Sequence, residues 1–186
     1  QPLLVPALEI QTIELDAGWR RRLVPDGFDW TLYTSANAVE SSLRQLPRPE
    51  RTGVAAVGRA TARTLEQHGI AVTAVPTTTS DSEGLLELEC FADLRGRRVL
   101  ILKGRGGRTL LREELARRGA EIVLGDVYER RRAEATPAVL EALRRACDAG
   151  RAVIAATSAD VLAALLELAP AERCPRLLDA ALLVPG

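Results

Sequence analysis

Short apolar segments rich in β-branched residues alternate along most of the chain with longer segments of helical periodicity. This alternation restricts the fold more than any other feature, because parallel strands need crossover connections and are buried beneath the helices that form them. We expect strands at 30–33, 54–57, 71–75, 99–102, 122–124, 153–156 and 181–184, and helices at 38–46, 60–68, 82–91, 109–118, 137–148 and 160–168. The sequence therefore predicts an α/β protein built on parallel sheets.

Two segments, 4–13 and 126–132, do not follow this pattern. Each has an extended, partly polar pattern, and no helix follows it directly. We interpret them as crossing strands that join two lobes, since a chain of 186 residues is long enough for two small domains. The predicted lobes are a continuous one at 13–126 and a second one assembled from 1–12 and 127–186.

A short repeat supports this division. Residues 34–37 read Thr-Ser-Ala-Asn and residues 157–160 read Thr-Ser-Ala-Asp, each between a predicted strand and a predicted helix. The final Asn or Asp is a good helix N-cap. In both copies another apolar strand follows and ends in a glycine loop, at Gly58 and Gly186. Composition alone can make βα units resemble one another, but the shared tripeptide favours a duplication.

The composition argues against several classes of function. Basic and acidic residues balance at 25 each and aromatic residues make up 3% of the chain, so a general affinity for nucleic acid or for an anionic membrane is not expected. Three widely spaced cysteines and one histidine offer no metal-ligand spacing. No apolar run approaches the roughly 20 residues that span a membrane, and no signal peptide opens the chain. We expect a cytoplasmic protein, monomeric by default.

Four loops rich in glycine and small hydroxyl residues follow predicted strands, at 34–37, 58–61, 103–108 and 157–160. Ligands of open α/β sheets gather beyond the carboxyl ends of the strands, where the backbone N–H groups of helix N-termini bind anions. Ordinary helix capping would place the same residue types there. The candidate binding residues in these loops are Thr34, Ser35, Ala36, Gly58, Thr61, Lys103, Gly104, Thr157 and Ser158.

The loop at 103–108 matches nucleotide-binding motifs poorly. It supplies the first two glycines of GxGxxG but not the third, and the Walker pattern is absent. Its charge is more informative, because seven basic and no acidic residues lie between Arg95 and Arg112. This asymmetry indicates a local attraction for a polyanion, although a solvated arginine-rich face would look the same. Lys103 is the only lysine of the chain.

Tyr128 lies in the second crossing strand, at the predicted junction of the lobes. Its phenol can donate a hydrogen bond to an oxygen leaving group without carrying a charge, and structural packing is the equal alternative. His68 precedes Gly69 at the end of a predicted helix, where we expect it to act as a C-cap.

Taken in order, these motifs resemble the uroporphyrinogen-III synthase family. The resembling segments are 3–10, 33–39, 56–62, 82–86, 99–104, 119–120, 127–130 and 157–158. The resemblance implies two flavodoxin-like parallel-sheet lobes joined by a two-stranded β-ladder, with the substrate held in the cleft. It also implies that the outer lobe is truncated at both chain ends, and the absence of methionine leads us to expect a piece of a longer protein.

The resemblance further implies an activity. Enzymes of this family convert hydroxymethylbilane, a linear tetrapyrrole polycarboxylate, into uroporphyrinogen III with loss of water and inversion of the terminal pyrrole, without a metal or organic cofactor. By the same resemblance, Tyr128 lies near the leaving hydroxyl, Thr61 and Ser158 donate hydrogen bonds, and Thr34, Ser35 and Gly58 supply cleft backbone. A non-enzymatic ligand-binding or regulatory module on the same fold is the alternative, and a nucleotide- or phosphate-binding enzyme is a third.

Overall fold

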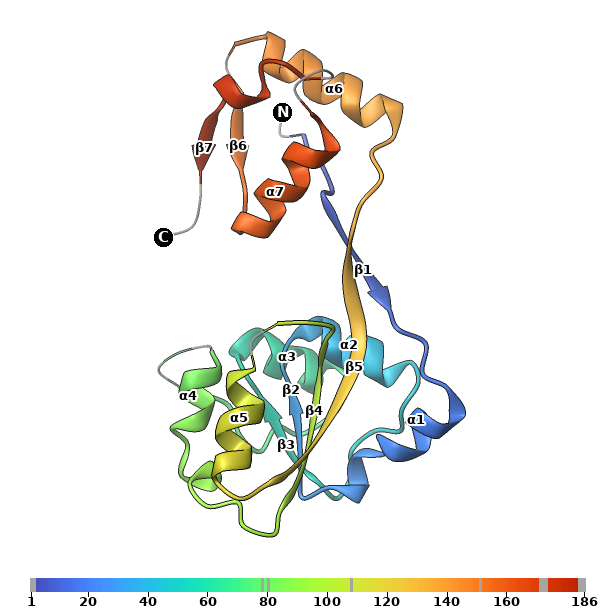
Figure 1. Cartoon of the computed structure of the whole chain (residues 1–186), viewed down its shortest axis with the longest axis vertical. Helices are drawn as coiled ribbons and strands as arrows, with labels where there is room; N and C mark the ends of the chain where they lie inside the picture. The colour runs from blue at the N-terminus through green and yellow to red at the C-terminus, as the bar shows by residue number, and fades with distance from the viewer. Residues whose placement is uncertain are drawn as a thin grey trace. The chain divides into compact units, whose positions relative to one another are not determined.

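The computed structural model describes residues 3–77, 79, 81–107, 109–150, 152–170 and 174–183, and the chain divides into two compact units (Figure 1). The continuous unit comprises Gln11–Glu129, and the terminal unit comprises Gln1–Ile10 together with Arg130–Gly186. The two divisions of the chain, after Ile10 and after Glu129, fall within strands: β1 (Leu8–Thr12) and β5 (Glu121–Arg132). In the part of the chain described, no helix combines the length and apolar character that crossing a membrane requires.

A parallel arrangement of β2 (Trp30–Tyr33), β3 (Gly53–Ala56), β4 (Arg98–Gly104) and β5 forms the centre of the continuous unit, and β1 flanks β5 at the edge of the sheet. The register places Trp30 opposite both Gly53 and Val99. These strands are almost continuously apolar because helices cover both faces of the sheet. The chain is therefore an α/β protein, and the fold class predicted from the alternating pattern of the sequence is confirmed.

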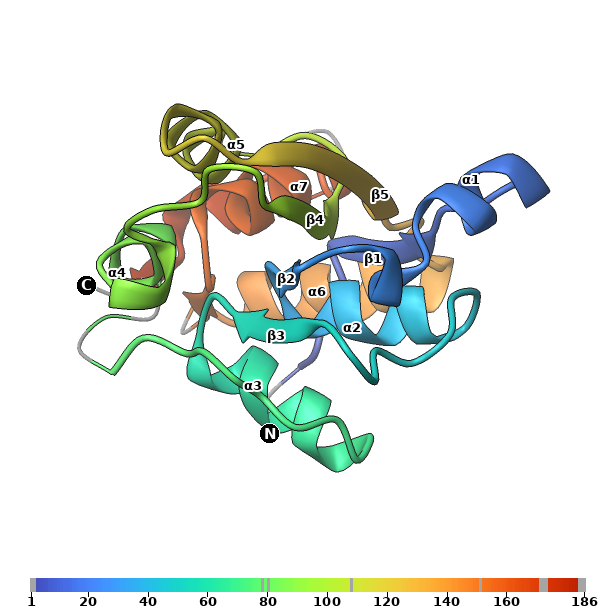
Figure 2. The same ribbon diagram turned by 90° about the horizontal axis from the view of Figure 1, so that it is seen from below.

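Alternate residues of β4 enter two separate cores. Leu100 and Leu102 pack with α2 (Ala36–Leu43) and α3 (Arg59–Gln67), while Val99 and Ile101 pack with α4 (Ser82–Leu86) and α5 (Leu110–Arg117). Figure 2 shows the two helix pairs on opposite sides of β2, β3 and β4. The three layers bring the helix N-termini and the carboxyl ends of the strands to one edge of the sheet.

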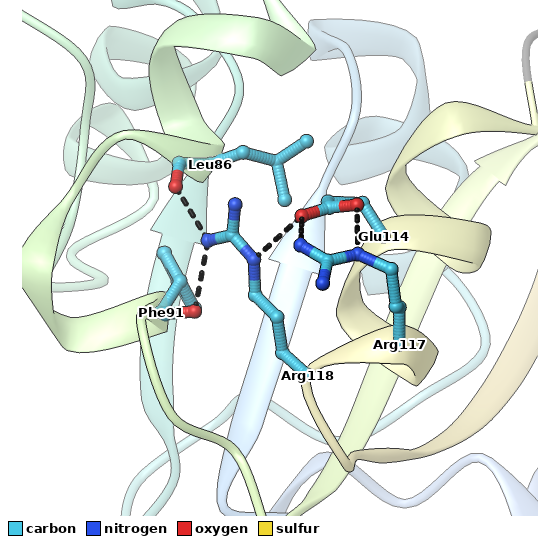
Figure 3. Close-up of polar contacts among 5 residues, drawn as sticks. All are labelled: Leu86, Phe91, Glu114, Arg117 and Arg118. Atoms are coloured by element: carbon cyan, nitrogen blue, oxygen red, sulfur yellow. Dashed lines mark hydrogen bonds and ion pairs between the residues drawn. The ribbon is translucent and has the colours of Figure 1, made fainter.

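Arg118 connects α5 to the layer beside it (Figure 3). Its Nη1 donates to the backbone carbonyls of Leu86, at 2.6 Å, and of Phe91, at 3.0 Å, and its Nε donates to Glu114 at 2.9 Å. Phe91 ends a short 3-10 turn, Glu89–Phe91, that follows α4. The helix expected at 82–91 is therefore wrong in extent, because it is divided into α4 and this turn.

Two other local predictions need correction. The strand expected at 71–75 is reduced to a single parallel bridge between Ala74 and Ala55, since Pro76 follows directly and has no N–H to extend the ladder. The segments expected separately at 122–124 and 126–132 form one strand, β5. A short helix, α1 (Ala17–Arg22), was missed because none of its residues is buried and it has no apolar stripe to reveal it.

The strands of the continuous unit lie in the order β3-β2-β4-β5, with β1 beside β5. Ala74 adds a single bridge on the outer side of β3. Numbered along the chain from β2, the first four strands run 2-1-3-4, which agrees with the beginning of the flavodoxin-like order 2-1-3-4-5. As a result, the topological switch point falls between β2 and β4.

The terminal unit contains a smaller parallel sheet, β6 (Val153–Ala155) and β7 (Ala181–Leu183), with α6 (Pro137–Asp148) and α7 (Ala159–Leu168). These elements match the strands and helices expected there to within two residues. Its core is a cluster of buried small and aliphatic side chains that includes Ala7, Leu143, Cys147, Ala164, Leu165, Cys174 and Leu177. The glycine loop predicted at Gly186 lies outside the described residues.

Candidate functional site

Several of the predicted site residues lie around the switch point, at the carboxyl ends of β2 and β4. Thr34 follows β2 directly and joins the two strands, since its backbone N–H donates to the carbonyl of Leu102 at 3.1 Å and its hydroxyl donates to the same oxygen at 3.3 Å. Ala36 is the first residue of α2. Thr34 therefore joins the carboxyl end of β2 to β4 just beyond their last paired residues.

Ser35 is the N-cap of α2 and contacts Tyr128. Its Oγ accepts a hydrogen bond from the N–H of Ala38 at 3.1 Å and lies 3.1 Å from the hydroxyl oxygen of Tyr128. The cap predicted at Asn37 is therefore wrong by two residues. Because the Ser35 hydroxyl retains its own proton, it can donate to Tyr128 and leave the phenol proton free for a ligand.

A β-bulge positions Tyr128. Lys103 pairs with Asp126, whereas Gly104 pairs with Tyr128, so Val127 is an additional residue on β5. Val127 and Tyr128 consequently both belong to the core cluster shared with α2 and α3, at 0% and 4% exposure, although neighbours in a regular strand point to opposite faces. The bulge turns the phenol toward Ser35.

Gly104 provides the space for this ring. A Cβ atom at Gly104 would lie 2.6 Å from Cζ of Tyr128 and 2.9 Å from its hydroxyl oxygen. Non-bonded contacts of a Cβ atom this short are essentially never found in proteins, so no larger residue fits without movement of the ring. The predicted site residue Gly104 thus acts through close backbone approach to Tyr128.

The ammonium group of Lys103 is bound within the protein. Its Nζ donates to the carbonyls of Gly104 at 2.8 Å and Gly106 at 2.6 Å, and to the carboxylate of Asp126 at 3.0 Å. These three acceptors use all three of its donors, and its side chain is 17% exposed. Asp126 was not singled out from the sequence. The detectable signal was the only lysine and an acidic residue at the ends of neighbouring parallel strands.

A pocket of about 220 Å³ opens beside the switch point. Aliphatic side chains and glycines form most of its wall, and its charged residues are Lys103 and Arg112. The guanidinium of Arg112 is half-exposed and lies 3.9 Å from the carboxylate of Glu113. The pocket has room for a small ring or one arm of a larger ligand, and neither Tyr128 nor Ser35 is among its lining residues. It is lined by Thr34, Ile101, Lys103, Gly106, Gly107, Thr109, Leu111, Arg112 and Leu124.

The basic stretch 95–112, which we predicted to attract a polyanion, is largely paired with carboxylates. Six of its seven basic residues have a carboxylate partner, in every case from outside the stretch; the pairs are Arg95–Asp93, Arg97–Asp29, Arg98–Glu121, Lys103–Asp126, Arg105–Glu129 and Arg112–Glu113. The seventh, Arg108, lies outside the described residues. The stretch also runs along β4, so its two halves lie at opposite ends of the sheet. The count of basic residues along the sequence therefore overstated the positive electrostatic potential around this stretch.

The remaining predicted residues occupy helix N-termini. Gly58 is the N-cap of α3 and offers no side chain to the first-turn N–H groups, while Thr61 in that turn is only 5% exposed. In the terminal unit, Thr157 follows β6 and Ser158 caps α7, accepting from the N–H of Val161 at 3.2 Å. The backbone angles of Ser158 match those of Ser35 to within 2°, so the repeated tripeptide is a repeated structural unit.

Two titratable residues lie apart from this group. His68 is the C-cap of α3, as predicted, and its Nε2 lies 2.9 Å from the carboxylate of Glu40. Burial raises the pKa of the Tyr33 phenol above its ordinary value, so that side chain is a neutral core residue. Among the residues that the structure describes, no three His, Cys, Asp or Glu side chains are grouped to hold a metal ion.

The strand order, with a hydroxyl pair and a pocket near the switch point, places the continuous unit in the doubly wound α/β class. The family model for uroporphyrinogen-III synthase HemD matches residues 1–185. The chain belongs to the uroporphyrinogen-III synthase family.

Named relatives agree with this assignment. The uroporphyrinogen-III synthase of Salmonella typhimurium is 36% identical over 107 residues, which cover 55% of this chain and 44% of the relative. That of Escherichia coli is 37% identical over 93 residues, covering 49% of this chain and 38% of the relative. The matched part of the chain thus spans less than half the length of each of these two relatives.

Solved structures show the same fold. Uroporphyrinogen-III synthetase from Helicobacter pylori superposes with a TM-score of 0.64 at 22% identity, covering 88% of this chain and 70% of that one. A mutant uroporphyrinogen III synthase from Thermus thermophilus superposes with a TM-score of 0.62 at 23% identity, covering 100% of this chain and 75% of that one.

Proposed function

We propose that the protein takes part in tetrapyrrole biosynthesis by converting hydroxymethylbilane into uroporphyrinogen III. The observation that carries the proposal is the hydroxyl pair of Tyr128 and Ser35, 3.1 Å apart at the switch point, in a chain whose family model matches residues 1–185. In this reaction the hydroxymethyl C–O bond breaks, the oxygen leaves as water after gaining a proton, and a new C–C bond closes the ring as a pyrrole carbon loses a proton.

In the proposed mechanism, Tyr128 donates a hydrogen bond to the departing oxygen. Charge develops on that oxygen as the C–O bond breaks, and a positioned phenol stabilises it without introducing a charge of its own. Ser35 donates in turn to the Tyr128 oxygen, which keeps the phenol proton directed at the ligand. The bilane also cyclises spontaneously to the isomer without ring inversion, so the second task of the site is to hold the chain in the pose that inverts the terminal ring.

Recognition of the substrate carboxylates is assigned to groups that the protein leaves accessible. Arg112 in the pocket has its nearest carboxylate partner at 3.9 Å, and no side chain caps the first turn of α3 after Gly58. Backbone N–H groups at such a position bind anions. Thr157 and Ser158 are proposed as further substrate contacts, each at the carboxyl end of β6.

The proposal includes the finer architecture, two α/β lobes joined by a two-stranded ladder. β1 and β5 are neighbours in the sheet order, and both run across the boundary between the two units. Hydrogen bonds from Ile13 to the carbonyl of Val127, and from Ala133 to the carbonyl of Ala7, support an antiparallel pairing because one residue number rises as the other falls.

Chromatography of the product isomers tests the activity. The protein is incubated with freshly prepared hydroxymethylbilane, and we expect uroporphyrinogen III above the level formed without protein. Formation of only the spontaneous isomer would overturn the proposal and favour the non-enzymatic ligand-binding module.

Tyr128→Phe tests the role of the hydroxyl. Loss of a hydrogen bond to developing charge reduces turnover by about tenfold or more. Tyr33→Phe is the matched control, since Tyr33 is the other tyrosine of the chain and lies in the core with 1% exposure; we expect its turnover to match the parent. Equal turnover in Tyr128→Phe and Tyr33→Phe would remove Tyr128 from the mechanism.

A further inference from the structure

The bulge between β4 and β5 determines where the Tyr128 side chain points. Without the additional residue, Gly104 would pair with Val127, and Tyr128 would move one position along the ladder. A shift of one residue turns a strand's side chains to the opposite face, so the phenol would leave Ser35. A bulge costs ladder hydrogen bonds and needs other interactions to hold it.

Lys103 is bonded to both strands at this bulge. On β5 it binds the carboxylate of Asp126, the residue immediately before the additional Val127. On its own strand it binds the carbonyl of Gly104, the residue that faces the Tyr128 ring, and beyond the strand that of Gly106. The Lys103 side chain therefore bonds to β5 at the bulge through Asp126 and to the glycine backbone at the end of β4 through Gly104 and Gly106.

The choice of lysine fits this role. The chain has 25 basic residues and only one of them is lysine. A compact ammonium group can direct three donors at two closely spaced carbonyls and a carboxylate, whereas a planar guanidinium is suited to fork-like contacts with one carboxylate. An arginine at position 103 would keep the charge but would not fit between the carbonyls of Gly104 and Gly106.

We propose that the Lys103–Asp126 pair is a register latch, in which Lys103 is a positioning residue that holds the bulge and thereby aims Tyr128 at Ser35. Its effect on turnover rests on the proposed function, but its effect on Tyr128 does not. The proposal differs from a substrate-binding role for Lys103, in which the ammonium group would contact a substrate carboxylate and arginine would be an adequate replacement.

Fluorine NMR tests the latch without any substrate. The chain has two tyrosines, so labelling with 3-fluorotyrosine gives one signal for Tyr33 and one for Tyr128, assigned with the Tyr→Phe variants. We expect Lys103→Met and the isosteric Asp126→Asn to move or split the Tyr128 signal and leave the Tyr33 signal in place, which also shows that the unit is folded. The matched control is Glu121→Gln, because Glu121 pairs with Arg98 at 3.5 Å across the same two strands. A Tyr128 signal identical to the parent in both latch variants would overturn the proposal.

Kinetics separate positioning from substrate binding. If the latch acts through Tyr128, Lys103→Met lowers kcat about as much as Tyr128→Phe, and Lys103→Arg does not restore it. The kcat of the double variant, Lys103→Met with Tyr128→Phe, is then within about twofold of that of Tyr128→Phe alone. A raised KM with unchanged kcat, restored by Lys103→Arg, would show that Lys103 binds substrate and would overturn the latch. If no variant, including the parent, forms uroporphyrinogen III, the proposed function fails while the NMR result still decides the latch.

Discussion

Substituting Gly104 with alanine tests the packing that places the phenol. The new Cβ atom would lie 2.6 Å from Cζ of Tyr128 and 2.9 Å from Cε2, about 1 Å inside ordinary van der Waals contact. Tyr128 is 4% exposed, so the ring has no free space nearby and must leave its position. The hydrogen bond to Ser35 is then lost together with the packing.

The expected cost follows from these two contributions. Overpacking a buried site costs about 1–3 kcal/mol, and the lost hydrogen bond adds about 1 kcal/mol. A total of about 2–4 kcal/mol lowers the melting temperature by roughly 4–16 °C, at about 2–4 °C per kcal/mol for a chain of this length. Turnover falls at least as far as in Tyr128→Phe, because the hydroxyl is displaced.

Two other glycines provide matched controls in thermal unfolding followed by circular dichroism. Gly27→Ala introduces a Cβ with no atom within 4 Å and no positive φ, so we expect no loss of stability. Gly106→Ala also meets no atom, but its φ is +76°, so it costs only the backbone strain of about 1–2 kcal/mol. If Gly104→Ala unfolds at the same temperature as Gly27→Ala, the ring has room to adjust and the reasoning is refuted.

Three further outcomes are expected. Arg118→Ala leaves two carbonyls of the neighbouring layer without their donor, so the free energy of unfolding in urea falls by about 1–3 kcal/mol, whereas the exposed Arg117 tolerates alanine with little change. The Arg117 and Arg118 guanidinium groups lower the pKa of Glu114 from 4.5 to about 2. Because the folded pKa lies below the unfolded one, this stabilisation is present above about pH 4.5 and is lost as the pH falls toward 2. We therefore expect the free energy of unfolding of Glu114→Gln to depend less on pH in this range. Ser35→Ala and Ser158→Ala each remove a helix cap worth about 1 kcal/mol, measured by thermal unfolding; only Ser35→Ala moves the Tyr128 fluorine signal, and a cap loss in neither variant would contradict the capping geometry.

The alternating pattern of the sequence predicted the elements well where packing and local preference agree. The buried strands at 30–33 and 99–102 are apolar because helices cover both faces, so their composition reports their environment directly. Predictions failed where one neighbour overrides local preference. Pro76 prevents the segment at 71–75 from extending its ladder, and α1 has no buried face that a periodic pattern could reveal.

The candidate site was predicted in part. Tyr128, Ser35 and Gly104 were all selected from the sequence, and in the structure Ser35 and Gly104 each lie against Tyr128. The sequence did not show how they are arranged. Asn37, two residues after Ser35, was expected to cap the helix, and Gly104 was expected to face a ligand. The sequence did not show how far the basic stretch is neutralised, because its carboxylate partners, such as Asp29 and Glu121, lie elsewhere in the chain.

By itself, the sequence determined the class of fold, the helix and strand positions and the residue types at the carboxyl edge of the sheet, because these depend on periodicity and on local backbone chemistry. Only the tertiary structure decided the register between the strands and the bulge after Asp126. It also decided which charges are neutralised. These features depend on pairing between segments far apart in the chain, and a single additional residue in one pairing decides which face the phenol of Tyr128 occupies.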